Sequence, residues 1–134
     1  TEEIWHRGYV MSGDIGIWQT DGRLCIVDRK KDMIISGGEN IYTAEVERIV
    51  HEPPAVLEAA VVGLPDQRWG ELVTALVVPR EGASIDGAEL EAFCRERLAG
   101  FKVPRRVEVG SELPRNPMGK VQKFKIIEEL GEKE

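Results

Sequence analysis

Two apolar runs, at residues 56–62 and 72–78, constrain the fold of this chain more than any other feature of the sequence. Both runs are rich in β-branched residues and carry apolar side chains at almost every position. A strand with one solvated face would alternate apolar and polar residues, so unbroken runs are typical of strands buried on both faces. We therefore expect two central strands, and a shorter, charged run at residues 106–109 predicts a third strand at a sheet edge.

Three helical segments are expected around these strands. Thr43 is placed to cap the first helix, and Asp86 followed by Glu89 resembles the capping box of a second helix. The apolar positions of the third helix are Phe124, Ile127 and Leu130. The order of the segments predicts an α+β domain in which a small sheet of about three strands packs against helices.

A β-hairpin is expected ahead of this domain. The apolar runs at residues 15–19 and 24–27 flank a short segment that contains Asp21 and Gly22. An Asp-Gly pair between two apolar runs is a strong hairpin signal, because these residues accept the backbone geometry of a tight turn.

Residues 28–47 connect the hairpin to the first helix. They begin with five consecutive charged residues, continue through the apolar residues 33–35 and then reach Gly37 and Gly38. Glycine accepts a positive φ and has no Cβ, so another backbone or a thin ligand can pass close to it. Taken alone, this stretch predicts a turn between a strand and a helix.

The charge balance argues against a nucleic-acid-binding protein. The chain has 18 Lys and Arg against 24 Asp and Glu, which gives a formal net charge of -6, and no basic block is longer than a few residues. No apolar run approaches the roughly 20 residues that a membrane helix needs. The first residues also lack the apolar core of a signal peptide, so we expect a cytoplasmic location.

The cysteines and histidines do not indicate a disulfide or a metal site. Cys25 falls in an expected strand and Cys94 on the apolar face of an expected helix, where reduced cysteine packs as a small hydrophobic residue. His6 and His51 stand apart from any other candidate ligand, so no metal-binding residues are assigned.

The dipeptide Gly119-Lys120 is half of the phosphate-binding loop motif, but the rest of that motif is missing. Val121 stands where a hydroxyl residue would hold magnesium, and Pro117 stands where a glycine is needed. Pro114 and Pro117 stiffen the backbone while Gly119 lets it turn. The loop is therefore expected to present the ammonium of Lys120 outside the core.

Six short motifs follow one another from one end of the chain to the other. They are SGD at 12–14, DRKKD at 28–32, SGGENI at 36–41, WGE at 69–71, FKVP at 101–104 and PRNPMGK at 114–120. The series resembles the C-terminal part of the AMP-forming acyl-CoA synthetases, which belong to the adenylate-forming superfamily. The resemblance extends over about residues 8–130, nearly the whole chain.

The resemblance implies a reaction in two steps, with ATP and CoA as cosubstrates. A carboxylic acid attacks ATP to give an acyl-adenylate and pyrophosphate, and the thiol of CoA then displaces AMP. Lys120 resembles the lysine that promotes adenylation, Asp14 the carboxylate that accepts the ribose hydroxyls, and Arg29 a second nucleotide contact. Lys31 falls at the hinge about which the C-terminal domain rotates between the two steps.

The resemblance also implies a binding site for CoA. Gly37 and Gly38 would line the passage for the pantetheine arm, with Glu39 beside them. Trp69 would stack on the nucleotide end of CoA, and Lys102 would hold that end by its charge.

The same resemblance implies that residues 1–30 end a large N-terminal domain, with the hairpin as its remnant, and that residues 31–134 form the mobile C-terminal domain. The large domain would hold the acid, most of the ATP and its Mg²⁺, so this fragment alone is expected to be inactive. The spacing of Pro114, Gly119 and Lys120 resembles the context in which a lysine acetyltransferase inactivates bacterial acyl-CoA synthetases.

Two alternatives stay open. One is an adenylation module that loads the phosphopantetheine of a carrier protein, and the other is a module that acts only by binding a partner or CoA. Trp69 and Lys102 favour free CoA, because a carrier protein has no adenosine 3′-phosphate to hold. The sequence names neither the acid nor the oligomeric state.

Overall fold

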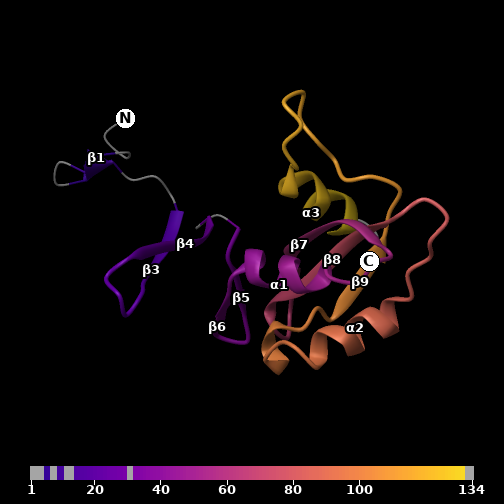
Figure 1. Cartoon of the computed structure of the whole chain (residues 1–134), viewed down its shortest axis with the longest axis horizontal. Helices are drawn as coiled ribbons and strands as arrows, with labels where there is room; N and C mark the ends of the chain where they lie inside the picture. Colours follow the sequence, from indigo (N-terminus) through magenta and orange to yellow (C-terminus); the bar gives the residue numbers. More distant parts are fainter. Residues whose placement is uncertain (1–4, 7–8, 11–13, 30–31, 132–134) are drawn as a thin grey trace.

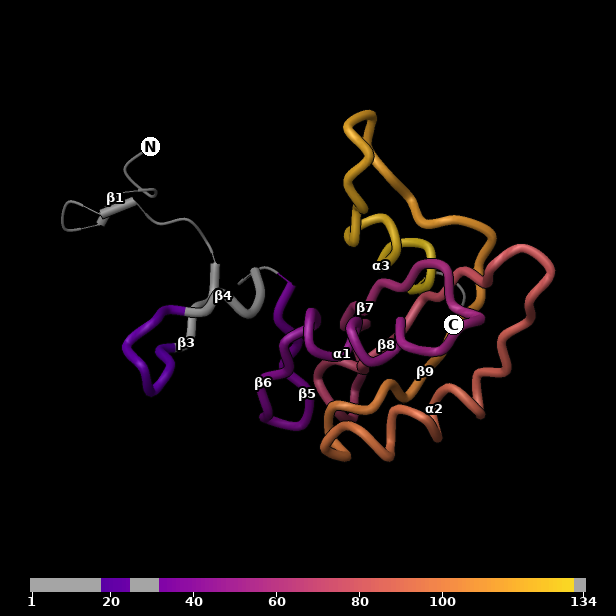
Figure 2. Tube along the Cα trace, viewed as in Figure 1, coloured from indigo at the N-terminus to yellow at the C-terminus, as the bar shows by residue number. Residues whose placement is uncertain are grey.

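The computed structural model describes residues 5–6, 9–10, 14–29 and 32–131, and gives side chains for residues 18–24 and 32–131 (Figures 1 and 2). Two short strands, β1 (Trp5–His6) and β2 (Tyr9–Val10), pair antiparallel near the start of the chain. They precede the hairpin and the α+β domain.

The expected β-hairpin is present. Strands β3 (Asp14–Trp18) and β4 (Leu24–Arg29) pair antiparallel, with Trp18 opposite Leu24 next to the turn. In the turn, the Asp21 carboxylate accepts a hydrogen bond from the Arg23 backbone N–H at 3.0 Å, and Gly22 has a φ of +86°. The Asp-Gly pair therefore forms the tight turn of the hairpin, as its position predicted.

A sheet of three strands forms the centre of the domain. Strands β7 (Val56–Asp66) and β8 (Gly70–Pro79) form a long antiparallel hairpin, and β9 (Arg106–Val109) lies parallel to β8 on its other side. Only β8 is central, so the expectation of two central strands is half right. Both strands are longer than their apolar runs, which leaves residues 67–69 as a tight connection.

Helices cover both faces of this sheet. Helices α1 (Thr43–Val50) and α2 (Gly87–Arg95) lie on one face, and α3 (Lys123–Gly131) lies on the other (Figure 1). Successive residues of a strand point to opposite faces. The first core accordingly contains Val73, Ala75 and Val77 of β8, and the second contains Leu76 and Val78. The predicted α+β fold is confirmed.

The helix starts agree with the sequence in one case and differ in another. The Asp86 carboxylate caps α2 by accepting a hydrogen bond from the Ala88 N–H at 2.9 Å. Thr43 does not cap α1, because Tyr42 occupies the capping position and makes no side-chain bond there. Thr43 is instead the first helical residue, and its buried hydroxyl accepts a hydrogen bond from Lys123 Nζ at 3.1 Å.

The inward face of α3 also differs from the expectation. Ile126 and Leu130 are buried against the sheet, one helical turn apart, whereas Phe124 is 57% exposed and Ile127 is partly buried. Only Leu130 of the three expected positions therefore lies in the core. Phe124 and Ile127 face a pocket instead.

Gly37 and Gly38 form the turn of a second small hairpin, which the sequence did not reveal. Strands β5 (Ile34–Ser36) and β6 (Glu39–Ile41) pair across it, and both glycines have a positive φ, 58° and 83°. A two-residue type I′ turn requires this geometry at both positions. The two glycines therefore close a hairpin, not the strand-to-helix turn expected from the stretch alone.

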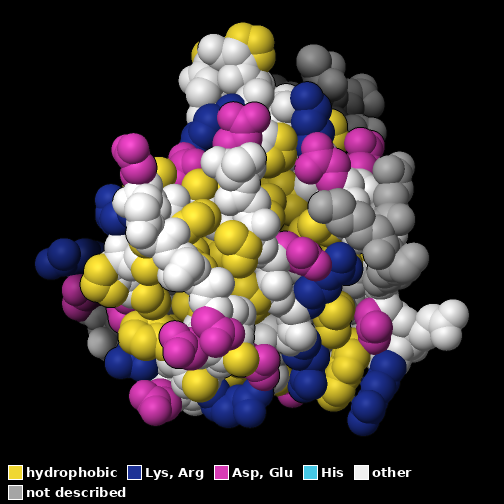
Figure 3. All heavy atoms as spheres, turned by 90° about the vertical axis from the view of Figure 1, so that its right-hand side faces the viewer, with side chains coloured by type: hydrophobic (Ala, Val, Ile, Leu, Met, Phe, Trp, Pro, Cys, Tyr) yellow, Lys and Arg dark blue, Asp and Glu magenta, His cyan; other side chains and the backbone are white. Residues whose placement is uncertain are grey.

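The remaining sequence expectations concern surface and core chemistry. On the face shown in Figure 3, acidic and basic side chains of the described residues are interspersed, without a broad basic patch. Cys94 is a free cysteine at zero exposure, and burial raises the pKa of its thiol; the side chain of Cys25 lies outside the described residues. None of the described helices is long and apolar enough to cross a membrane. The cytoplasmic location stays a prediction.

Candidate functional site

Residues 114–122 form a tight loop, which we call the lysine hairpin. The Gly119 N–H donates to the Asn116 carbonyl at 2.9 Å, and the Gln122 N–H donates to the Pro114 carbonyl at 2.9 Å. The side-chain oxygen of Asn116 also accepts the N–H of Met118 at 2.9 Å and that of Lys120 at 3.0 Å. Asn, Pro and Gly stand where a type I turn prefers them, so local chemistry defines this shape.

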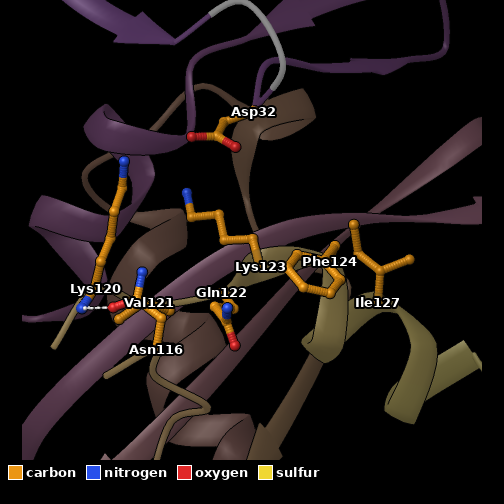
Figure 4. Close-up of a pocket in the computed structure, with 8 residues that line it drawn as sticks. All are labelled: Asp32, Asn116, Lys120, Val121, Gln122, Lys123, Phe124 and Ile127. Carbon is orange, nitrogen blue, oxygen red and sulfur yellow. Dashed lines mark hydrogen bonds between the residues drawn. The ribbon is translucent and has the colours of Figure 1, made fainter. Parts of the chain in front are cut away.

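The lysine hairpin borders an open pocket of about 630 Å³ (Figure 4). Phe124 and Ile127 of α3 form its apolar wall, and Asp32 lines it from the segment before β5. Gln122 Oε1 is buried without a hydrogen-bond partner among the described residues, so the protein leaves one acceptor unmatched at this wall. The pocket thus combines an apolar wall with charged groups at its rim.

Two lysines reach this pocket, and they differ in their partners (Figure 4). Lys123 Nζ lies 2.6 Å from Glu47 Oε1, and the same carboxylate oxygen accepts the Val61 N–H at 3.1 Å. Lys123 therefore ties α3 to α1 and β7. Lys120 is exposed, and its ammonium has no ion-pair partner among the described residues, so its charge is available to a ligand.

A second cluster forms where the β5–β6 turn meets Trp69. The Gly37 N–H donates to the Trp69 carbonyl at 2.8 Å, and a Cβ at Gly37 would lie 3.1 Å from Cε3 of the indole. A Cβ at Gly38 would meet nothing within 4 Å. Gly37 is therefore packed on the indole, whereas Gly38 lines open space.

Two guanidinium groups stand over the Trp69 ring. Arg105 lies 4.0 Å from the ring centroid and Arg68 lies 5.1 Å from it, both within the range of cation–π interactions. Neither arginine has an ion-pair partner in the part of the chain that the structure describes. The half-buried indole is therefore bordered by positive charge that suits an anionic ligand.

Lys102 is partly buried and forms an ion pair with an acidic residue of α1. Its Nζ lies 2.9 Å and 3.1 Å from the two carboxylate oxygens of Glu45, and the two side chains are 23% and 35% exposed. The sequence had indicated Lys102 as the cation of the CoA site and had missed Arg105, three residues further on. The adjacent arginines at 105 and 106 were the only sequence signal for it.

The remaining predicted site residues are only partly described. Asp14 and Arg29 lie opposite each other in the β3–β4 ladder, which is the register that would bring two nucleotide contacts together, but their side chains are outside the described residues. Lys31 lies outside them altogether, and Glu39 is exposed at the start of β6. The roles of these four residues stay predictions.

The described residues do not provide a metal site. Among them, no group of three His, Cys, Asp or Glu side chains is placed to hold an ion. His51, for example, uses its ring nitrogen Nε2 against the carbonyl of Leu57, 3.0 Å away.

Comparison with known proteins gives a consistent result. A family described as the AMP-binding enzyme C-terminal domain matches residues 45–120. The chain is 50% identical to a feruloyl-CoA synthase of Amycolatopsis sp. over 98% of its length, and 44% identical to a long-chain-fatty-acid–CoA ligase of Bacillus subtilis (strain 168) over 96%. It covers 27% and 23% of these relatives, about a quarter of their length.

Solved structures agree with the sequence relatives. ATP-bound MatB from Rhodopseudomonas palustris superposes with a TM-score of 0.90 at 39% identity, over 98% of this chain and 26% of that one. A fatty acyl CoA synthetase from Mycobacterium tuberculosis superposes with a TM-score of 0.79 at 41% identity, over 99% of this chain and 26% of that one.

The contact between Gly37 and Trp69 generates a test with a matched control. Alanine at either glycine of the turn should lower the free energy of unfolding by about 1–2 kcal/mol, because a side chain disfavours a positive φ. Gly37→Ala should cost more than Gly38→Ala, since only its methyl group meets the indole. Chemical denaturation gives the stability difference, and fluorescence in a background with Trp5 and Trp18 changed to Phe isolates Trp69. Equal losses with an unchanged Trp69 emission would contradict this packing.

Proposed function

Because the chain belongs to the AMP-binding enzyme C-terminal domain family, we propose that it is the mobile C-terminal domain of an AMP-forming acyl-CoA synthetase. In the first half-reaction a carboxylate oxygen attacks the α-phosphate of ATP, forming an acyl-adenylate and releasing pyrophosphate. In the second, the sulfur of CoA attacks the acyl carbon and AMP leaves. The observation that carries the proposal is the exposed Lys120 on its rigid hairpin, without an ion-pair partner among the described residues.

Lys120 is proposed as the catalytic cation of adenylation. Negative charge moves onto the phosphate oxygens and the pyrophosphate leaving group as the acid attacks. A cation already held in place stabilises that charge without reorganisation, most strongly where water is excluded. The bonds with Asn116 fix the backbone of Lys120 relative to the turn, which limits the directions its side chain can take from the hairpin.

The other nucleotide contacts are assigned to the hairpin and the large domain. Asp14 is proposed to accept the ribose hydroxyls and Arg29 to contact the nucleotide, which their opposed register supports. Lys31 is proposed as the hinge between residues 1–30, which end the large domain, and residues 31–134. The Mg²⁺ that accompanies ATP is assigned to the large domain, as the family resemblance implies; among the described residues no group of three His, Cys, Asp or Glu is placed to hold an ion.

The cluster around Trp69 is proposed to hold CoA. The open space beside Gly38 and the exposed Glu39 suit the passage of the pantetheine arm. Trp69 is proposed to stack on the adenine, with Arg105 turning from the ring toward the phosphate. Lys102 is already paired with Glu45, whereas Arg105 has no ion-pair partner among the described residues. Arg105 is therefore the better candidate for the 3′-phosphate, and Lys102 stays a second candidate.

A second candidate function is the loading of phosphopantetheine on a carrier protein. It needs the glycine turn but has no use for a nucleotide site. The arginines over Trp69 therefore favour free CoA. A module that acts only by binding would leave the hydrogen-bonded presentation of Lys120 without a role.

Lys120 is also proposed as a site of control by a lysine acetyltransferase. Its exposure at the hairpin makes the ammonium accessible, and acetylation would remove the charge that the first half-reaction needs. Mass spectrometry that finds Lys120 unmodified after incubation with a cognate acetyltransferase and acetyl-CoA would argue against this control.

The function is tested with the full-length protein, MgATP and a panel of ferulate, a long-chain fatty acid and 2-succinylbenzoate. We expect pyrophosphate release with at least one acid, and Lys120→Ala should lower its rate by about a hundredfold to a thousandfold. Thioester formation from a synthetic acyl-adenylate should be spared, and Lys125→Ala, which changes an exposed lysine of α3, should leave both steps unchanged. A Lys120→Ala protein that adenylates at the wild-type rate would overturn the mechanism.

The CoA site is tested by comparing CoA with 3′-dephospho-CoA. Trp69→Ala should raise the KM for both by about tenfold or more, because stacking on a base is lost. Arg105→Ala should raise only the KM for CoA, and Arg48→Ala on the exposed side of α1 is the matched control. Preference of the wild-type protein for a holo-carrier protein over CoA would support the second candidate function instead.

A further inference from the structure

The hydrogen bonds inside the lysine hairpin define its shape but not its direction relative to the sheet. The hairpin lies between the end of β9 and the start of α3 and projects from the body of the domain (Figure 1). Its tip is solvated, with Met118 92% exposed. Packing holds the two ends of the hairpin, since Leu113 is buried in the second core and Val121 packs against it. A bond from the turn itself to the sheet would further restrict the direction of Lys120.

The guanidinium of Arg115 makes that bond. Its Nη1 donates to the carbonyl oxygen of Gly119 at 2.7 Å, directly before Lys120 in the chain. Its Nη2 donates to the carboxylate of Glu58, which lies on β7 opposite Val78. One planar group therefore joins the last residue of the turn to the central hairpin of the sheet.

In the part of the chain that the structure describes, no second side-chain bond duplicates this connection. Among the described residues, the other hydrogen bonds of residues 115–120 stay within residues 114–122, and no other ion pair leaves them. Arg115 and Glu58 are 41% and 30% exposed, so water screens their attraction and the pair adds little to stability. Its two directional hydrogen bonds instead restrict orientation, which the flat fork of arginine does better than the ammonium of lysine.

We propose that Glu58 and Arg115 are positioning residues that aim Lys120 at the reacting phosphate during adenylation. This inference rests on the proposed function and adds two residues to it. Neither side chain touches the substrates, and both act through the carbonyl of Gly119. A displacement of about 1 Å at a reacting group is enough to cost roughly a hundredfold in rate, so a pair with little effect on folding has a large effect on chemistry.

The test uses the full-length protein with the acid of the panel that turns over fastest. Glu58→Leu removes the acceptor at similar size, Arg115→Lys keeps the charge without the fork, and the double variant Glu58→Leu with Arg115→Leu is compared with each of its single variants. The matched control is Glu108→Leu on β9. It removes the ion pair between Arg106 Nε and Glu108 Oε1, which are 2.8 Å apart, and Glu108 is 33% exposed, much like Glu58. This ion pair does not include a residue of the hairpin.

We expect Glu58→Leu, Arg115→Leu and Arg115→Lys each to lower the kcat of pyrophosphate release by about tenfold, with the KM values for ATP and acid nearly unchanged. Thioester formation from the synthetic acyl-adenylate should stay within about twofold of wild type, since it does not use Lys120. The double variant should be no slower than the slower single variant, because both residues act through one contact. Glu108→Leu should match wild type in both half-reactions.

Three results would overturn the positioning role of Glu58 and Arg115. The first is a Glu58→Leu adenylation rate equal to that of Glu108→Leu, and the second is a double variant whose fold-loss in rate is the product of the two single losses. The third is an equal loss of rate in both half-reactions, which would indicate a general folding defect. If Lys120→Ala slows adenylation but Glu58→Leu does not, the positioning role fails and the proposed function stands. If Lys120→Ala adenylates at the wild-type rate, the proposed function and the positioning role both fail.

Discussion

The structure depends on the burial of β8 between two helical layers. Its residues 73–78 are all buried, and they alternate between a core shared with α1 and α2 and a core shared with α3. Fully burying each Val or Leu contributes about 1.5–3 kcal/mol, so this one strand supplies much of the drive to fold. Both functional clusters lie outside these cores, and the sheet serves as the fixed frame against which the lysine hairpin and the glycine turn are held.

The pairing of charges decides which cations are available for chemistry. Two acidic residues of α1, Glu45 and Glu47, each neutralise a lysine from a distant part of the chain, Lys102 and Lys123 respectively. Lys120 and Arg105 have no such partner among the described residues. The first helix thus ties distant parts of the domain together through two lysines, while Lys120 and Arg105 are among the cations left without an ion-pair partner in the described part of the chain.

Sequence reasoning succeeded where the chemistry is local and failed where a distant residue competes. Asp86 caps its helix through a residue two positions on, and Asp21 closes its own turn. Thr43 has the right side chain for a cap, but its hydroxyl is buried and accepts a bond from Lys123, 80 residues away. Phe124 has the right polarity for a core, but Ile126 takes the inward position and leaves Phe124 at the pocket.

The sequence by itself determined the shape of the lysine hairpin, because Asn116, Pro117 and Gly119 form the turn through bonds that span at most four residues. It also determined that Gly37 and Gly38 allow a close approach. Only the tertiary structure decided that Trp69 fills the space beside Gly37, that Glu45 removes Lys102 from the free cations, and that Glu58 directs the hairpin. These contacts join residues 32 to 57 positions apart, and their partners meet only after the sheet has brought them together.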